Sequence, residues 1–448
     1  MRNPAGVLLL FFSCVLMFSY PGWAMGKRPP KKPAAPVSQP VSVTLEECYG
    51  LALQRSETVA IRREEIARTT AQFLEATGEA VGNVDFVMTD FFQKPQKGDG
   101  SGGSVGTSLT APEKRERKFV ISQPLFQGFK ALGALQGAGS LRKQRTAERV
   151  RAEELLFLDV VHAFYGLLRQ AKDVDAIEGI HNLFEQRIGE LGEREKIGRS
   201  RASETATARA QMKILDAELA RSRGALAIAR QILEFLTGLP FDPKQLQETD
   251  LPQSSAPEVS FSTGGVESRS DVEASEQAMK TAWRNVIVTQ SDLWPKITLE
   301  SNQYERREGF QSGIDWDVLF KVNVPLFKGG ETAGKVKEAV SSWKEAKLSY
   351  SLVKRQADLE IKQTYQDWKT SLERHKALEE AVKASEENYE LQRDEYSRNL
   401  VNNLDVLQAM ESLLDTRRQA NEAYYAVKEN SWRFEVASGK FREEGSVP

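Results

Sequence analysis

The sequence predicts a mostly helical chain with a small β-portion, built from a duplicated unit. First, residues 316–324 alternate between apolar and mostly polar side chains, the pattern of a β-strand with one apolar face. Second, this strand ends at Pro325 and passes through Pro-Leu-Phe into a long helical pattern, and the same passage begins at Pro124, 201 residues earlier. Third, most of the chain is rich in Ala, Glu, Lys, Arg, Leu and Gln, the composition of long helices.

The bulk composition excludes several functional classes. Charged residues make up 28% of the 448 residues, but the formal net charge is −2, so no basic excess points to nucleic acid. Only two cysteines and three histidines are present, and Cys14 falls inside the expected export signal. The mature chain would keep Cys48 alone, so it cannot form an internal disulfide.

The first 43 residues read as an export signal followed by a tether. Residues 1–24 combine Arg2, an apolar run over 6–18 and a small-x-small cleavage pattern, which predicts a secretory signal peptide. The residues before Cys14 make a poor lipidation site, and residues 25–43 are a Pro-rich tether. No other stretch is long and apolar enough for a membrane helix, so any membrane insertion would use strands.

The rest of the chain divides into two copies of one unit: a helix, a β-hairpin, a very long helix, a turn and a second long helix. The first repeat spans 44–240, with strands at about 83–93 and 118–124 and a helical tip at about 198–203. After a linker at 241–267, the second spans 268–440, with strands at about 296–304 and 313–325 and a tip at about 399–403, and a tail follows at 441–448. The offset of 201 aligns Gly133 with Gly334 and Ala208 with Ala409, and a longer polar loop at 94–117 accounts for the different offset upstream.

Four strands are too few for a closed barrel, and an open sheet edge cannot lie in lipid. The apolar positions Trp316, Val318, Phe320 and Val322 therefore predict a lipid-facing strand in an outer-membrane barrel to which several copies contribute. Three copies would supply twelve strands, within the range of known barrels. The alternative is a periplasmic coiled-coil adaptor or structural protein without a pore, which would leave the apolar face exposed.

Several motifs in this order and spacing resemble the TolC family of outer-membrane efflux and secretion channels. Besides the duplicated strand, Pro-Leu-Phe, Gly and long-helix unit, they are Tyr396 with residues 403–409, Arg269-Ser270-Asp271, and Ser438-Gly439. The resemblance implies a homotrimer with a twelve-stranded transmembrane β-barrel, continued by a twelve-helix periplasmic α-barrel. Such channels are not enzymes and need no cofactor. They form the exit duct of a tripartite efflux or type I secretion system in the outer membrane of a Gram-negative bacterium, passing substrates from periplasm or cytoplasm to the exterior. Their partners are a periplasmic adaptor (membrane fusion protein) and an inner-membrane transporter of the RND, ABC or MFS type.

The resemblance also assigns roles to residues. It places the corners between barrel and tunnel at Pro124, Gly128, Pro325 and Gly329. The helical tips for adaptor docking would be Gly198, Arg199, Ser200, Asn399, Leu400 and Val401. The periplasmic gate would use Asp405, with Gln408 at the family's second acidic position and Glu204 at the matching place in the first repeat. Rings of like charge in a narrow pore attract cations, although acids at these positions are also favoured simply by a helix N-terminus. Val401 stands where some members carry an arginine that pairs across the tip.

The sequence contains no complete motif for nucleotide binding or metal binding. Residues 329–335 approach the phosphate-loop pattern, but Val336 stands where a Ser or Thr must bind magnesium. The three histidines, His162, His181 and His375, have no metal-ligand spacing. Neither an enzyme nor a cofactor site is expected.

Overall fold

The computed structural model describes residues 42–92, 113–248, 264–308 and 312–439. The expected signal peptide, nearly all of the tether, most of the 94–117 loop, much of the linker and the tail lie outside the described residues. The helices in chain order are α2 (Leu45–Arg55), α3 (Glu57–Val81), α4 (Lys130–Lys196), α5 (Ala202–Thr237), η1 (Pro243–Gln245), α6 (Gly264–Glu267), α7 (Ser270–Gln290), η2 (Ser291–Leu293), α8 (Glu331–Ser397) and α9 (Asn403–Ala437). The strands are β1 (Asn83–Phe92), β2 (Glu113–Gln127), β3 (Lys296–Arg307) and β4 (Trp316–Asn323).

The two sequence copies adopt the same arrangement. The run α3–β1–β2–α4–α5 is followed by α7–β3–β4–α8–α9. Helices α4 and α8 both contain 67 residues, and they begin at Lys130 and Glu331, which are separated by the offset that aligns the sequence motifs. The returning helices begin at Ala202 and Asn403, again at that offset. The duplication therefore holds for the long helices and their turns.

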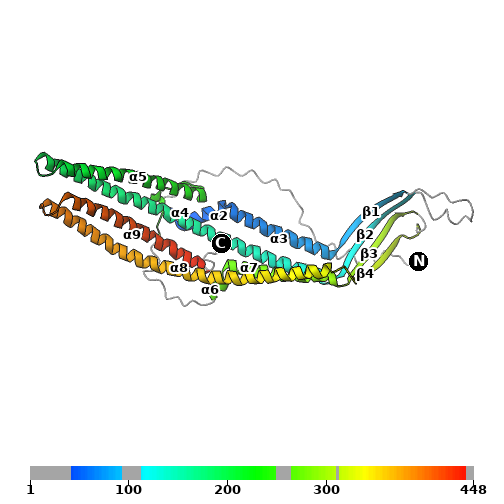
Figure 1. Ribbon diagram of the computed structural model, residues 1–448. Coiled ribbons are helices and arrows are strands. Elements are labelled where there is room, and N and C mark those ends of the chain that lie inside the picture. Colours follow the sequence, from blue (N-terminus) through cyan, green and yellow to red (C-terminus); the bar gives the residue numbers. More distant parts are fainter. Residues whose placement is uncertain (1–41, 93–112, 249–263, 309–311, 440–448) are drawn as a thin grey trace, which may run out of the picture. The chain divides into compact units, whose positions relative to one another are not determined.

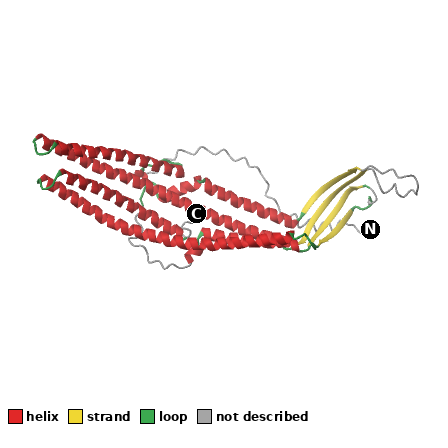
Figure 2. Cartoon of the chain, in the orientation of Figure 1, coloured by secondary structure: helices red, strands yellow, loops and turns green. Residues whose placement is uncertain are grey.

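The strands form one antiparallel sheet in the order β1-β2-β3-β4 (Figure 1). Asn83 is opposite Ser122 in the first hairpin, and Lys296 is opposite Asn323 in the second. The hairpins meet through β2 and β3, where Ile121 is opposite Ser301. Strands β1 and β4 are thus the edges of the sheet within the described chain. The expected mostly helical fold with a small antiparallel sheet is confirmed (Figure 2).

Strand lengths differ from the sequence prediction. Strand β2 starts at Glu113 instead of about 118, so part of the expected loop lies in the ladder. It continues past Pro124 because the register with β3 shifts between Pro124 and Phe126, where the missing proline N–H interrupts the ladder. Strand β4 is shorter than the predicted 313–325, which fits its position at an edge with one partner.

The helix predicted from Thr44 to about residue 80 is two helices. Thr44 and Glu47 form the expected capping box, with bonds of 3.3 Å and 2.9 Å. Ser56 then ends α2 and caps α3, its hydroxyl accepting a hydrogen bond from the Val59 N–H at 3.3 Å. The break allows α2 to contact both α4 and α5, while α3 packs along α4.

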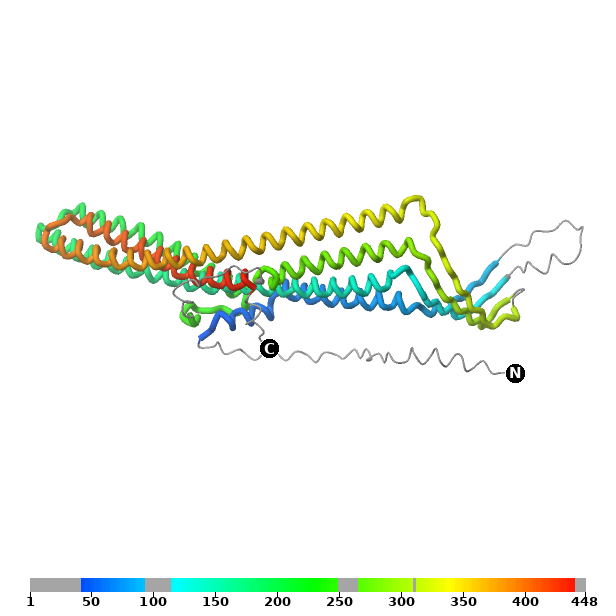
Figure 3. Tube along the Cα trace, turned by 90° about the horizontal axis from the view of Figure 1, so that it is seen from below, coloured from blue at the N-terminus to red at the C-terminus, as the bar shows by residue number. Residues whose placement is uncertain are grey.

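The long helices pack as two antiparallel hairpins, α4 with α5 and α8 with α9. Figure 3 shows α3 and α7 alongside the first parts of α4 and α8, with α5 and α9 alongside the last parts. Helix α9 contacts the second half of α4, whereas α5 and α9 scarcely touch. Among the described helices, none contains a stretch long and apolar enough to cross a membrane.

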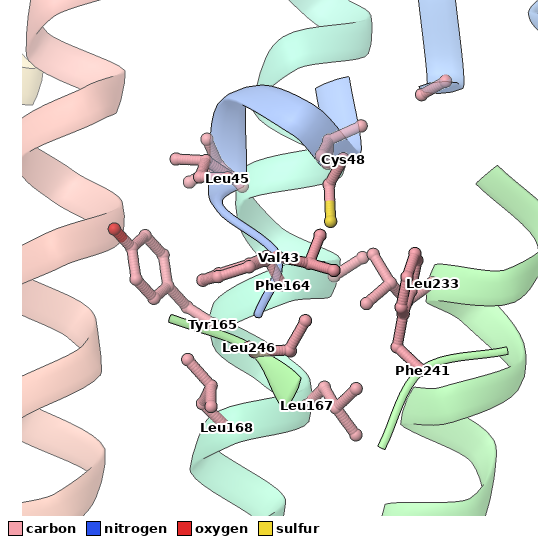
Figure 4. Close-up of a cluster of buried hydrophobic side chains, with 14 of the residues drawn as sticks. Val43, Leu45, Cys48, Phe164, Tyr165, Leu167, Leu168, Leu233, Phe241 and Leu246 are labelled. Carbon is pink, nitrogen blue, oxygen red and sulfur yellow. The ribbon is translucent and has the colours of Figure 1, made fainter. Parts of the chain in front are cut away.

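A hydrophobic core joins the start of the described chain to the middle of α4. Figure 4 shows Val43 and Leu246 next to Phe164, which is fully buried. Val43 also pairs with the segment after α5, donating its N–H to the Gln245 carbonyl at 2.7 Å. The residues that follow the tether are therefore fixed to the body of helices.

Candidate functional site

One face of the sheet is apolar and exposed. The four predicted lipid-facing residues of β4 are between 51% and 61% exposed: Trp316, Val318, Phe320 and Val322. The ladder register places further exposed apolar side chains on this face from the other hairpin: Phe119, Ile121, Val84, Phe86 and Met88. An exposed apolar face of this extent marks a surface that interacts with a membrane or with another protein.

The opposite face is polar and internally bonded. The Asp317 carboxylate accepts hydrogen bonds of 2.8 Å from the Asn302 amide and from the Tyr304 hydroxyl. Arg307 lies 3.7 Å from Asp317, and its guanidinium stands 4.1 Å from the centre of the Tyr304 ring. Leu319 is the apolar exception on β4, and the ladder register places Val87, Phe91 and Val120 of the first hairpin on the same face. The sheet thus has one side suited to lipid and one suited to water.

The corners after β2 and β4 use the predicted residues in two different environments. Gly128 and Gly329 both have positive φ, +60° and +59°. A Cβ on Gly128 would meet the Ser291 carbonyl at 2.6 Å and Trp294 at 2.7 Å, so only glycine fits. Nothing lies within 4 Å of a Cβ on Gly329. The first corner is packed within the protomer, whereas the second is open.

The Pro-Leu-Phe segments differ in the same way. Pro124, Leu125 and Phe126 belong to β2, and the Phe126 ring packs against Phe129 with centroids 5.4 Å apart. After Pro325, in contrast, Leu326 is 93% exposed and Phe327 is 88% exposed. The first Pro-Leu-Phe segment is thus partly covered within the chain, with Leu125 52% exposed, whereas the second is bare.

The two helical tips are the same turn used twice. Residues 197–201 join α4 to α5, and residues 398–402 join α8 to α9. Each turn has one residue in the left-handed region, Gly198 at φ +73° and Asn399 at φ +59°. Each is closed by a bond across five residues, from Arg199 N–H to the Arg194 carbonyl at 2.8 Å and from Leu400 N–H to the Glu395 carbonyl at 3.0 Å. The predicted tip residues Ser200 and Val401 follow in these turns.

The gate candidates lie just beyond the turns. Asp405 is half-buried and forms a capping box, accepting the Asn402 N–H at 3.0 Å. Gln408 is exposed one turn later. Glu204 accepts hydrogen bonds from the Ser200 hydroxyl at 2.8 Å and from the Tyr396 hydroxyl at 3.2 Å. Glu204 therefore connects the two hairpins, whereas Asp405 is bonded within its own tip.

Two arginines of α4 complete a connection between the hairpins that sequence reasoning missed. The Tyr396 ring lies between Arg187 and Arg194, whose guanidinium carbons are 3.7 Å and 4.7 Å from the ring centre. Arg187 also donates to the Asn403 side-chain oxygen at 2.9 Å, and Arg194 donates to the Tyr396 carbonyl at 3.5 Å. We call Arg187, Arg194, Glu204, Tyr396 and Asn403 the tip latch. No local signal marks these arginines, because their partners lie about 200 residues away in sequence.

A second polar cluster surrounds Arg269, which is only 2% exposed. Arg269 donates to Asp271 at 2.8 Å and 3.0 Å, to Glu360, and to the Ala437 carbonyl at 2.9 Å. Burial opposes the charged forms, but the hydrogen bonds between these groups outweigh it, so the pKa of Arg269 is raised and that of Asp271 is lowered. The cluster fixes the start of α7 to α8 and to the end of α9.

The histidines and the lysine of the rejected motifs have partners unrelated to metal or nucleotide binding in the described chain. Across the described ranges, no three His, Cys, Asp or Glu side chains come close enough to hold a metal. The histidines are separate: His162 pairs with Glu429 at 3.1 Å, and His181 pairs with Asp216 at 2.9 Å. Lys335, the lysine of the rejected phosphate-loop pattern, binds Glu331 of its own helix.

Comparisons with known proteins agree with this geometry. A sequence model of the family described as "Outer membrane efflux protein" matches residues 266–440. No curated protein matches the chain. The fold is similar to that of CusC, a protein that folds to form a transmembrane channel. The TM-score is 0.79 at 17% identity, over 92% of this chain and 98% of that one. It is also similar to the outer membrane protein VceC of Vibrio cholerae, with a TM-score of 0.76 at 20% identity, over 88% of this chain and 96% of that one. The CmeC outer membrane channel of Campylobacter jejuni has a TM-score of 0.76 at 16% identity, over 88% of this chain and 85% of that one.

The family match covers the second repeat, and the structural matches extend the same fold over both repeats. Proteins of this family are transport channels and not enzymes. Residues 266–440 therefore match the outer membrane efflux protein family, and the chain as a whole has a fold similar to that of solved outer-membrane channels.

Proposed function

We propose that three copies of this chain form an outer-membrane channel that serves as the exit duct of a tripartite efflux or type I secretion system. The observation that carries the proposal is the four-stranded sheet, which has one exposed apolar face, one polar face and two open edges. A sheet of this kind can enter lipid only after its edges are paired. Copies that join β4 of one chain to β1 of the next close the sheet.

The internal repeat supplies the register of that junction. In one chain, Ile121 of β2 is opposite Ser301 of β3. Val322 is the repeat equivalent of Ile121, and the matching hairpin registers make Met88 the equivalent of Ser301. The same relation places Val322 of one copy opposite Met88 of the next. Both side chains lie on the apolar face, so the junction keeps that face continuous.

This register also covers the bare corner. Within the chain, Phe126 lies opposite Ile297 and is half-buried. At the junction its repeat equivalent, Phe327, would lie opposite Val84 of the neighbouring copy. Phe327 and Val84 are 88% and 67% exposed in the single chain. Burial of one large apolar side chain contributes roughly 1.5–3 kcal/mol, and a threefold assembly repeats that gain at each junction.

Three copies give a twelve-stranded barrel, with the apolar face toward lipid and the Asp317 face toward the lumen. The helices then continue from the strands into the periplasm as a twelve-helix tunnel that ends at the two tips. The tip latch and the acid at Asp405 form its gate. A periplasmic adaptor (membrane fusion protein) docks on the tips at 197–201 and 398–402. An inner-membrane transporter of the RND, ABC or MFS type supplies the energy, since no nucleotide site is expected in this chain.

Membrane fractionation tests the proposal. The full chain is expected in the detergent-extracted outer membrane and to run as a heat-resistant trimer on electrophoresis. The alternative, a periplasmic adaptor or structural protein without a pore, predicts a soluble monomer in the periplasmic fraction. Recovery as that monomer would remove the channel from consideration.

A further inference from the structure

We infer that α3 of one copy packs against α8 of the next copy, in the register in which α7 packs against α4 within the chain. This helical contact rests on the proposed function, which joins β4 of one copy to β1 of the next. Strand β4 leads into α8, and β1 follows α3, so the strand junction brings these two helices to the same place. The internal repeat then determines which side chains meet.

Helix α7 has two helical neighbours, and its repeat equivalent α3 lacks one of them. In Figure 3, α7 lies between α4 and α8, and it packs on both. Ser270 and Ala274 of α7 follow Ser56 and Ala60 by 214 residues, so α3 is the equivalent of α7, just as α8 is the equivalent of α4. Helix α3 packs along α4, as α7 packs along α8, but α3 and α8 lie on opposite sides of the α4–α7 pair (Figure 3). The counterpart of the contact between α7 and α4 is therefore a contact between α3 and the α8 of another copy.

Two glycines of α4 give the register of the contact with α7. A Cβ on Gly133 would lie 3.0 Å from Val288, and a Cβ on Gly137 would lie 3.4 Å from the Cβ of Arg284. The helices are thus antiparallel, and the same register carried on by two turns places Gln144 opposite Gln277. All residues of this contact line are buried or half-buried: Gly133, Gly137, Ser140, Gln144 and Ala147 on α4, opposite Val288, Arg284, Thr281, Gln277 and Ala274 on α7.

The equivalent residues of α8 and α3 are exposed in the single chain. Ala147 is 1% exposed, whereas its equivalent Leu348 is 71% exposed. Val288 is half-buried, whereas its equivalent Leu74 is 72% exposed, and nothing lies within 4 Å of a Cβ on Gly334. The two offsets convert the register into five pairs of exposed residues: Gly334 with Leu74, Glu338 with Thr70, Ser341 with Ala67, Glu345 with Arg63, and Leu348 with Ala60.

The pairs are complementary in size. The large side chain of Leu74 is opposite glycine at 334, and that of Leu348 is opposite Ala60. Each end of the contact line thus combines one large apolar side chain with one small residue, which lets the two helices approach without overfilling the space between them. Helices of one sequence have this relation only when α3 and α8 come from two copies of the chain.

The pairs are also complementary in charge. Arg63 is opposite Glu345, at the place where the contact within the chain has two glutamines. The neighbouring Arg62 is paired with Glu65 of its own helix at 2.9 Å, so it does not compete for Glu345. Opposite charges across an interface select the partner and its register, even where each exposed ion pair is weak. A second copy of this chain is therefore the occupant that fits this face.

Charge reversal in outer membranes tests the register. The temperature at which trimers of the full chain dissociate is read by electrophoresis. Arg63→Glu places two carboxylates opposite each other at each junction and should lower this temperature by roughly 2–4 °C. Adding Glu345→Arg restores opposite charges and should recover the wild-type temperature. The matched control, Arg63→Glu/Glu338→Arg, makes the same change of charge on the same face of α8, two turns away, and should not recover it.

Cross-linking identifies the occupant of the face. Ala60→Cys/Leu348→Cys should give covalent dimers and trimers of this chain with a short thiol cross-linker, whereas Ala60→Cys/Ser341→Cys, shifted by two turns, should not. A cross-linked product that contains another polypeptide, the same ladder in both pairs, or equal recovery by Glu345→Arg and Glu338→Arg would overturn the contact. A heat-resistant wild-type trimer without these effects contradicts only the helical contact, whereas a wild type recovered as a soluble monomer contradicts the proposed function.

Discussion

Removal of the Tyr396 hydroxyl tests whether the tip latch holds the channel closed. In Tyr396→Phe the ring stays between Arg187 and Arg194, and only the 3.2 Å hydrogen bond to Glu204 is lost. A hydrogen bond to a charged group contributes about 1.5–3 kcal/mol. Glu204 keeps its bond from Ser200, so the lower end of that range applies. The closed state should therefore lose about 1.5 kcal/mol, which corresponds to a factor of about ten in the closed-to-open ratio.

Tyr396→Ala removes the ring as well. Two cation–π contacts at this partly solvated tip contribute about 0.5–1 kcal/mol each, so the total loss is about 3 kcal/mol before the packing of the ring is counted. The two variants should therefore form a graded series. Their effects on the closed state are ordered by how much of the latch each one removes.

Single-channel recording in planar bilayers measures this series. The fraction of time spent in the high-conductance state should rise at least about tenfold in Tyr396→Phe, because each of the three copies loses one hydrogen bond, and further in Tyr396→Ala. Tyr389→Phe is the matched control, because Tyr389 lies on the same helix with its ring 5.9 Å from Arg393 of that helix. The reasoning fails if Tyr396→Phe and Tyr389→Phe behave alike, or if Glu204→Gln adds its full effect to that of Tyr396→Phe.

Three further predictions concern single positions. Asp405→Asn keeps a side-chain acceptor for the helix cap and removes one charge per copy, so cation block should weaken while helix content stays constant; unchanged block in bilayers would exclude Asp405 from the gate. Arg269→Met should destabilise the protomer by about 3–5 kcal/mol in thermal unfolding at pH 7, because it leaves the Asp271 carboxylate partly buried without its cation. Because the folded-state pKa of Asp271 is lowered, its stabilising effect should be present above about pH 4 and disappear as the pH falls through the folded-state value, and the methionine variant should lack this part of the pH dependence. Gly128→Ala should lower protomer stability more than Gly329→Ala, because both place a Cβ at a positive φ but only the first also clashes with Ser291; Gly329→Ala should in addition lower the heat resistance of the trimer, and equal effects on the monomer would contradict the open corner.

Local signals were enough to find the long helices and their turns. Proline-free helical stretches, glycine or asparagine at a left-handed position, and the repeated offset each act within a few residues, so α4, α8 and both tips follow from the sequence. The alternation around Phe320 likewise identified the exposed face of β4, because a period of two requires no knowledge of the partner strand.

Features that depend on distant partners were missed. Residues 113–117 read as a polar loop, but pairing with β1 brings them into β2, because partner strands compensate for poor strand propensity. The family resemblance placed a latch residue at Val401 in the second tip, whereas the structure supplies the cations from Arg187 and Arg194 in the first repeat. The break at Ser56 was also missed, since a helical pattern continues through a residue whose capping role depends on the packing of α2.

Cross-linking between copies tests the central claim, a barrel closed by β4 of one chain and β1 of the next. Met88→Cys/Val322→Cys should form covalent dimers and trimers in outer membranes with a short thiol cross-linker, because the two side chains are expected to be opposite each other on the same face. The native Cys48 is fully buried and contributes little background. Met88→Cys/Lys321→Cys is the control, since Lys321 faces the other side. The account predicts a covalent ladder in the first pair only; no ladder, or the same ladder in both, would contradict it.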